Sequence, residues 1–191
     1  MDYTNFRWRN ESALRMEGDT LIMTAPPKTD YFVDPLGTLS KLNAPFYYTD
    51  VTGDFTLKAR VWHPFREVYD SCTLMVMDKD DVWAKCCFEG TDYGTHAAVS
   101  VVTNGYSDDA NGSDITQPYL WLQLCRKGNV FASHYSLDGE KWIMTRYYSL
   151  PAAETVKVGL VAQSPIGEGS EMSFANVSLT SGAPENMRAG K

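Results

Sequence analysis

Two stretches of the sequence carry most of the side chains that could do chemistry. Between residues 82 and 89, strand-like alternation places Trp83, Lys85 and Glu89 on one side, and between residues 119 and 126 it places Trp121 and Gln123 together. Flat aromatic rings stack on the C–H faces of a sugar, while charged and amide groups exchange hydrogen bonds with its hydroxyls. These residue types predict a surface that binds a saccharide or a related polar small molecule.

Three further polar side chains are expected on that surface, two from residues 96–103 and one from residues 142–148. The complete set of predicted ligand-binding residues is Trp83, Lys85, Glu89, His96, Ser100, Trp121, Gln123 and Arg146. In the alternative interpretation, Lys85 and Glu89 form an ion pair on a solvated sheet and the tryptophans only cover apolar surface. The three remaining tryptophans, Trp8, Trp62 and Trp142, are expected to be packing residues.

Patterns typical of hydrolysis are missing. Retaining glucanases of sandwich architecture alternate their carboxylates along one strand, about 5–5.5 Å apart, and no such pattern occurs here. The sequence also lacks a Gly-x-Ser-x-Gly elbow, and His63, His96 and His134 are not spaced as local metal ligands. We therefore predict no catalytic residues, no metal and no cofactor, while an enzyme of unassigned reaction stays an open alternative. Asp108, Asp109, Asn111 and Asp114 are interpreted as a solvated loop rather than a calcium site.

Period-two alternation must position these side chains, because it recurs along the chain and helical spacing does not. Nine stretches are predicted to be strands: 54–62, 72–78, 82–89, 96–103, 119–126, 130–136, 142–148, 156–163 and 172–180. Residues 104–112 are predicted to be a polar loop, because they are rich in Gly, Asp and Asn. Short strands with turn signals every 8–12 residues favour a sandwich or barrel over βαβ units.

Several segments, in order, resemble a single family. They are Lys28-Thr29-Asp30, Val51-Thr52-Gly53-Asp54-Phe55, Tyr69-Asp70 with Leu74-Met75-Val76, Trp83-Ala84-Lys85 with Glu89, Ser100-Val101-Val102-Thr103 with Tyr106-Ser107-Asp108, Trp121 with Arg126, Tyr135-Ser136-Leu137-Asp138-Gly139, and Val158-Gly159-Leu160 with Ser164-Pro165 and Gly167. Together they resemble the domain of unknown function 1349 family, whose fungal members are labelled regulation-of-enolase proteins. The match covers roughly residues 5 to 180. One departure is Asp109-Ala110-Asn111, where an aromatic residue is expected after Asp108.

The resemblance implies a fold but no reaction. That fold is an all-β, two-sheet antiparallel jelly-roll sandwich of the concanavalin A-like lectin/glucanase type. The fungal label keeps a second function open, in which the protein is a metabolic regulator that docks a protein partner or forms a homo-oligomer.

Length and charge set the remaining expectations. A chain of 191 residues fits one sandwich domain, expected over residues 1–180, with a polar and disordered tail at 181–191. The net charge of −7 disfavours nucleic acid and anionic membranes as partners. Cys72, Cys86, Cys87 and Cys125 lie in apolar runs and are interpreted as reduced core thiols. No secretion signal or membrane-spanning segment is evident, so a cytoplasmic location is expected.

Overall fold

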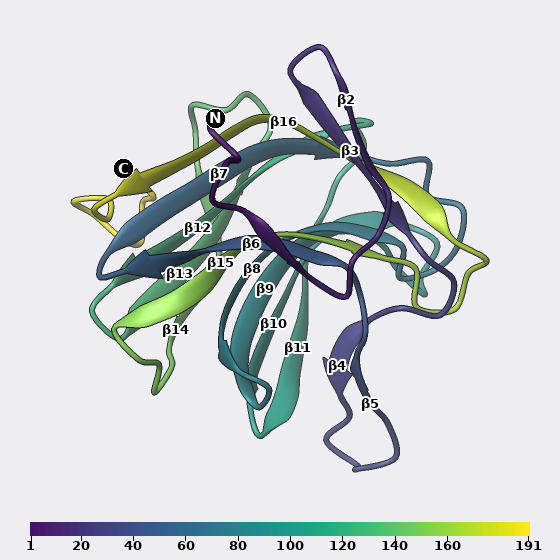
Figure 1. Cartoon of the computed structure of the whole chain (residues 1–191), viewed down its shortest axis with the longest axis horizontal. Helices are drawn as coiled ribbons and strands as arrows, with labels where there is room; N and C mark the ends of the chain where they lie inside the picture. The colour runs from purple at the N-terminus through teal and green to yellow at the C-terminus, as the bar shows by residue number, and fades with distance from the viewer.

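The computed structural model of the protein describes residues 1–191 and contains sixteen β-strands. Sheet I has the order β1 (Arg7–Arg9), β6 (Phe46–Thr52), β15 (Thr155–Gln163), β8 (Ser71–Lys79), β9 (Val82–Gly90), β10 (His96–Asn104) and β11 (Tyr106–Asp114). Sheet II has the order β14 (Ile143–Ser149), β13 (Val130–Ser136), β12 (Leu120–Lys127), β7 (Phe55–Trp62), β16 (Ser170–Ser181), β3 (Thr20–Ala25) and β2 (Leu14–Glu17). A hairpin of β4 (Tyr31–Val33) and β5 (Ser40–Leu42) projects beside β11 (Figure 1).

The two sheets pack face to face as an antiparallel sandwich, which confirms the predicted all-β fold class (Figure 1). Alternation explains the packing, since β7 directs Phe55, Leu57, Ala59 and Val61 into the core between the sheets. That core contains 29 buried residues from both sheets. Burial of this much apolar surface is the main term that stabilises such a sandwich. No helix in the structure is long and apolar enough to span a membrane.

The four cysteines are free and buried, as predicted. Cys72 and Cys86 point into the core between the sheets. Cys87 and Cys125 belong to smaller clusters on the outer faces, and the Cys125 cluster includes Met187 from the C-terminal segment. Burial raises the pKa of the Cys125 thiol to about 12, so this side chain behaves as a small apolar group.

The predicted polar loop at residues 104–112 is wrong, because most of it belongs to strand β11. β11 forms the edge of sheet I and pairs with β10 through its backbone. An edge strand can keep both faces polar when little packs on it, so its side chains show no alternation for a sequence pattern to detect. The six strands before residue 54 were also not predicted. Several of them are only three or four residues long.

The C-terminal segment, expected to be a disordered tail, has a defined path across the outer face of sheet II. β16 itself continues to Ser181. Beyond it, the Gln123 side-chain amide donates to the carbonyl of Gly190 at 3.1 Å, and His134 Nε2 donates to the carbonyl of Met187 at 2.9 Å. The same Gln123 amide lies 3.3 Å from His134 Nδ1. Two buried polar side chains of the sheet therefore hold this segment.

A Gly190→Ala change is expected to loosen the C-terminal segment without unfolding the sandwich. Gly190 has a φ of 69°, and a Cβ there would lie 2.9 Å from Gln123 Nε2 and from Trp142 Cβ. Left-handed strain and this crowding together should lower the free energy of unfolding by about 1–2 kcal/mol. Hydrogen exchange should accelerate over residues 183–191 and stay slow in β7. Unchanged exchange in both regions would contradict this docking geometry.

Candidate functional site

A pocket with a cavity volume of about 270 Å³ opens on the outer face of sheet I. The β4–β5 hairpin and the turn after β15 form its walls, and β9, β10 and β11 contribute its floor and rim. Its lining residues are Asp30, Phe32, Leu39, Lys41, Tyr69, Lys85, Glu89, Val101, Asp109, Gln163, Pro165 and Ile166. The mixture of apolar walls and a few convergent polar groups is typical of small-molecule sites, and the volume lies just below that of drug-sized pockets.

Lys85 is the buried cation of this pocket. Its ammonium donates to the carbonyl of Tyr31 at 2.7 Å, to Gln163 Oε1 at 3.0 Å and to Asp30 Oδ1 at 3.3 Å. An ammonium has three hydrogens, so these acceptors use all of them. Burial works against the charge, but Asp30 and other nearby acidic groups outweigh it, and the pKa of Lys85 is raised. Lys85 therefore ties the β4–β5 hairpin to sheet I.

Glu89 is buried in the same pocket without such partners. The residue is only 8% exposed, and no protein group donates a hydrogen bond to its carboxyl. Burial raises the pKa of Glu89 to about 8, although Lys85 partly opposes this. A carboxyl that stays protonated near neutrality and faces a cavity is common at functional sites. The Glu89 carboxyl is a buried polar group that the protein leaves free in this pocket.

Tyr69 and Asp109 frame the opening. Tyr69 has a φ of 69°, a left-handed conformation that is rare for a bulky residue, and its backbone N–H donates to the carbonyl of Gly90 at 2.6 Å. Strained backbone of this kind tends to occur at functional sites. Asp109 lies on the exposed rim in β11, and partial desolvation raises the pKa of its carboxyl. An aromatic ring and a second acid are thus available to a ligand.

Of the predicted ligand-binding residues, Lys85 and Glu89 line this pocket. Trp83 projects from the same face of β9, but its side chain is fully buried. Its indole N–H donates to the carbonyl of Asp80 at 3.1 Å, and its ring meets Tyr31 edge to face. Trp83 therefore packs against Tyr31 of the β4–β5 hairpin and does not face the cavity.

His96, Ser100 and Arg146 lie outside the pocket. Ser100 pairs with Cys86, so it points toward the core between the sheets, on the opposite face of β10 from Val101. The His96 ring stacks on Phe65 at 3.5 Å near the start of β10. Arg146 bonds Asp108 at 2.7 Å and links edge strand β14 to edge strand β11.

Trp121 and Gln123 lie on β12 in sheet II. Both side chains point to the outer face of that sheet, where Gln123 contacts the C-terminal segment and Trp121 packs beside Gly139. The expectation that all eight residues share one face therefore does not hold. Alternation assigns the side of a strand correctly, but it does not tell which of the two sheets a strand joins.

Most polar residues of the pocket were not predicted from the sequence. The missed polar residues are Asp30, Lys41, Tyr69, Asp109 and Gln163. Two of them, Asp30 and Tyr69, lie in segments that carry the family resemblance, as does Pro165. The family resemblance of those segments was the available signal. It singled out these residues without showing that they lie together in the fold.

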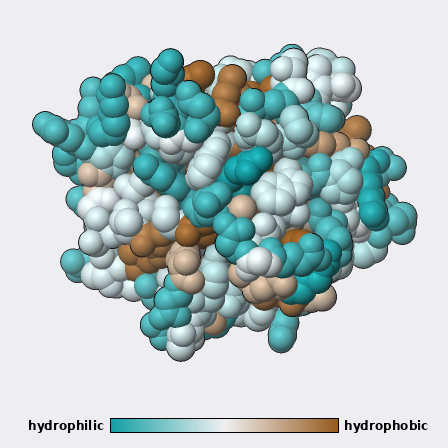
Figure 2. Space-filling view, turned by 90° about the horizontal axis from the view of Figure 1, so that it is seen from above, coloured by the Kyte–Doolittle hydropathy of each residue, from teal (hydrophilic) through white to brown (hydrophobic).

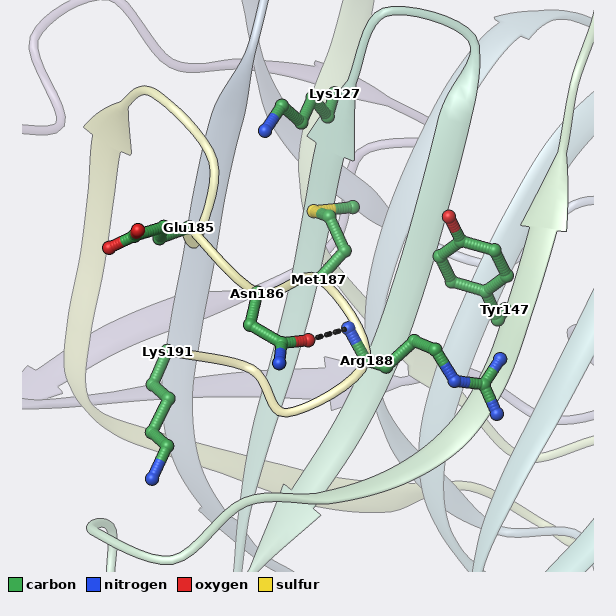
Figure 3. A pocket seen from close by; sticks show the side chains of 7 residues that line it. All are labelled: Lys127, Tyr147, Glu185, Asn186, Met187, Arg188 and Lys191. Carbon is green, nitrogen blue, oxygen red and sulfur yellow. Dashed lines mark hydrogen bonds between the residues drawn. The ribbon is translucent and has the colours of Figure 1, made fainter.

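A second hollow, of about 670 Å³, is formed by the C-terminal segment with β12 and β14 (Figure 3). Its residues are Lys127, Tyr147, Glu185, Asn186, Met187, Arg188 and Lys191. Except for Met187 they are exposed to solvent, and Asn186 Oδ1 accepts a hydrogen bond from the Arg188 backbone within the segment itself. This wide hollow has no buried polar group aimed into it, so the pocket on sheet I is the stronger candidate. No group of three or more His, Cys, Asp or Glu side chains could hold a metal ion.

Sequence comparison finds one matching family and one related protein. The family described as "Protein of unknown function (DUF1349)" matches residues 8–182. The protein named "Regulation of enolase protein 1" from Saccharomyces cerevisiae is 26% identical over 180 residues, covering 91% of this chain and 88% of that protein.

Solved structures share the sandwich. A functionally unknown protein from Saccharomyces cerevisiae superposes with a TM-score of 0.88 at 24% identity, covering 96% of this chain and all of that one. The GH43 protein BlXynB from Bacillus licheniformis gives a TM-score of 0.67 at 12% identity, over 95% of this chain and 40% of that one. Lectin I-B4 from Griffonia simplicifolia gives 0.56 at 12% identity, over 93% of each chain. At these identities the likeness concerns the fold alone.

Proposed function

Because the chain belongs to the DUF1349 family and has a lectin-like β-sandwich, we propose that it binds a carbohydrate or a related small polar molecule in the pocket of sheet I. The site is the one around Glu89, Tyr69 and Asp109. The proposal concerns binding and assigns no reaction.

The unpartnered carboxyl of Glu89 carries the proposal. The carboxyl of Glu89 borders the cavity and has no hydrogen-bond partner in the protein, so a bound ligand can donate to it. Sugar hydroxyls are suitable partners, since each can donate to a carboxyl oxygen and accept from a neighbour. The half-exposed Tyr69 ring and the apolar side chains of Phe32 and Ile166 supply surfaces for the C–H face of a sugar ring.

Tyr69→Ala is expected to weaken the binding of a monosaccharide by about tenfold, because it removes the ring that frames the opening. Isothermal titration calorimetry against a panel of neutral monosaccharides would measure this. Trp121→Ala is the matched control, since Trp121 is also a partly exposed aromatic residue but lies on sheet II. Equal losses in the two variants, or no heat with any sugar, would contradict the proposal.

A second candidate function is regulation through a protein partner. It is favoured by the name of the yeast relative, Regulation of enolase protein 1. On the face seen in Figure 2, polar side chains predominate and apolar ones form small separate groups, so no broad apolar interface is evident there. Light scattering of the chain mixed with enolase would test this candidate. A complex mass above that of either protein would support it, and unchanged masses would oppose it.

A further inference from the structure

The pocket offers a ligand two uncommitted acidic groups and little uncommitted positive charge. We infer that its ligand carries one positive charge, as an amine on a small hydroxylated scaffold such as an amino sugar. This inference rests on the proposed function and narrows the class of ligand. It follows from which charged groups of the lining already have a partner in the protein.

The two ammonium groups of the pocket are largely committed to the protein, whereas the Tyr69 hydroxyl and the Gln163 amide N–H groups donate to no protein acceptor and stay available to ligand hydroxyls. All three hydrogens of Lys85 go to Tyr31, Gln163 and Asp30. Lys41 donates to the carbonyl of Pro165 at 3.1 Å and lies 3.3 Å from the carbonyl of Lys28. An anionic ligand such as a phosphate or a carboxylate would meet two free carboxyls and little uncommitted positive charge here.

The acceptors, in contrast, remain open. Neither Glu89 nor Asp109 accepts a hydrogen bond from another side chain, and Glu89 is more than nine-tenths buried. Each carboxylate provides about four acceptor positions, so two of them demand several ligand hydrogens. An ammonium group, which only donates, is the complement of such a site.

The charge balance points the same way. Among the lining residues, Asp30, Glu89 and Asp109 are acids, and Lys41 and Lys85 are bases. Asp30 and Lys85 form an ion pair at 3.3 Å. With both remaining acids ionised, Lys41 balances only one of them, and a ligand with a single positive charge balances the other.

Protonation of Glu89 keeps this side chain uncharged in the empty pocket, so no unbalanced negative charge is buried there. Burial raises the pKa of Glu89 to about 8, with Lys85 opposing the rise and Asp109, Asp30 and Asp92 adding to it. The side chain thus holds a proton near neutral pH until a cation approaches. An arriving ammonium favours the carboxylate, so binding should release a proton.

The test is calorimetric titration of the whole chain at pH 7 with four probes: glucosamine, glucose, N-acetylglucosamine and ethanolamine. Glucosamine should bind at least about tenfold more tightly than glucose or N-acetylglucosamine. Titrations in two buffers of different ionisation enthalpy should show proton release for glucosamine and not for glucose. Glu89→Gln should abolish both the preference and the proton release. Asp108→Asn, which removes the neighbouring acid on the opposite face of β11 and outside the lining, should retain them.

The outcomes separate this inference from the proposed function. If glucose and glucosamine bind equally, or if the preference survives in Glu89→Gln, sugar binding stands and the charge inference fails. If only ethanolamine binds, and Glu89→Gln removes that binding, the charge inference stands and the carbohydrate proposal fails. If none of the four probes binds, both the charge inference and the carbohydrate proposal are overturned. Circular dichroism of the Glu89→Gln protein checks that a lost preference does not reflect unfolding.

Discussion

Glu89→Gln is expected to stabilise the unliganded protein by about 2–4 kcal/mol at pH 8.5 and to change little at pH 4. An exposed glutamate has an ordinary pKa of 4.5, and burial raises the pKa of Glu89 to about 8 in the fold. Between these values the folded state keeps a proton that the unfolded state has lost. Stability therefore falls as pH rises through this window, and the full cost is present above pH 8. Gln has no charge to desolvate and escapes that cost.

Urea unfolding of both proteins from pH 4 to pH 9 would measure the effect. Other groups also impose pH dependence, such as buried His63, whose pKa is lowered by burial to about 3. His63 lowers stability as pH falls below about 6.5, which is the opposite sense. The difference between the two proteins cancels that contribution. A difference that is flat with pH, or a less stable Gln variant at pH 8.5, would show that Glu89 is not buried as described.

Lys85→Met should destabilise the protein. It should lower the free energy of unfolding by about 3–5 kcal/mol at neutral pH, a larger effect than that of Glu89→Gln. The change removes one partner of a buried ion pair and leaves Asp30, the Tyr31 carbonyl and Gln163 without a donor. Breaking one side of a buried pair is costly because the other side stays desolvated. The β4–β5 hairpin should lose protection first, since Lys85 ties it to sheet I.

Thermal unfolding and hydrogen exchange would test this second prediction. Lys41→Met is the matched control, because Lys41 lines the same pocket but is only partly buried and bonds only backbone carbonyls there. Lys41→Met should lower the free energy of unfolding by no more than about 1 kcal/mol. If both variants are equally stable, the three acceptors around Lys85 do not hold the hairpin.

The fold could be predicted from the sequence where burial differs between the faces of a strand. β7 shows alternation because one of its faces lies in the core between the sheets and most of the other face is partly exposed. β11 lacks this contrast, so it was predicted to be a loop. Alternation therefore fails to identify an edge strand when both faces of that strand are largely exposed.

The candidate site could be predicted only in part, and the reason is topological. Lys85 and Glu89 were found because they share one strand with a period of two. Asp30, Tyr69 and Asp109 reach the same cavity from distant segments, through the hairpin, the turn before β8 and the edge strand. Trp121 and Gln123 were grouped with them because their residue types matched, although their strand belongs to the other sheet. Chemistry on separate strands cannot be assembled until the sheet order is known.

The acidic edge strand has a consequence for the solution behaviour of the protein. An open sheet edge can pair with the edge of another copy through unpaired backbone groups, which is a common route to aggregation. β11 places Asp108, Asp109 and Asp114 along the edge of sheet I. Two such edges repel each other when brought together, so the same residues that gave no strand signal keep neighbouring molecules from extending the sheet.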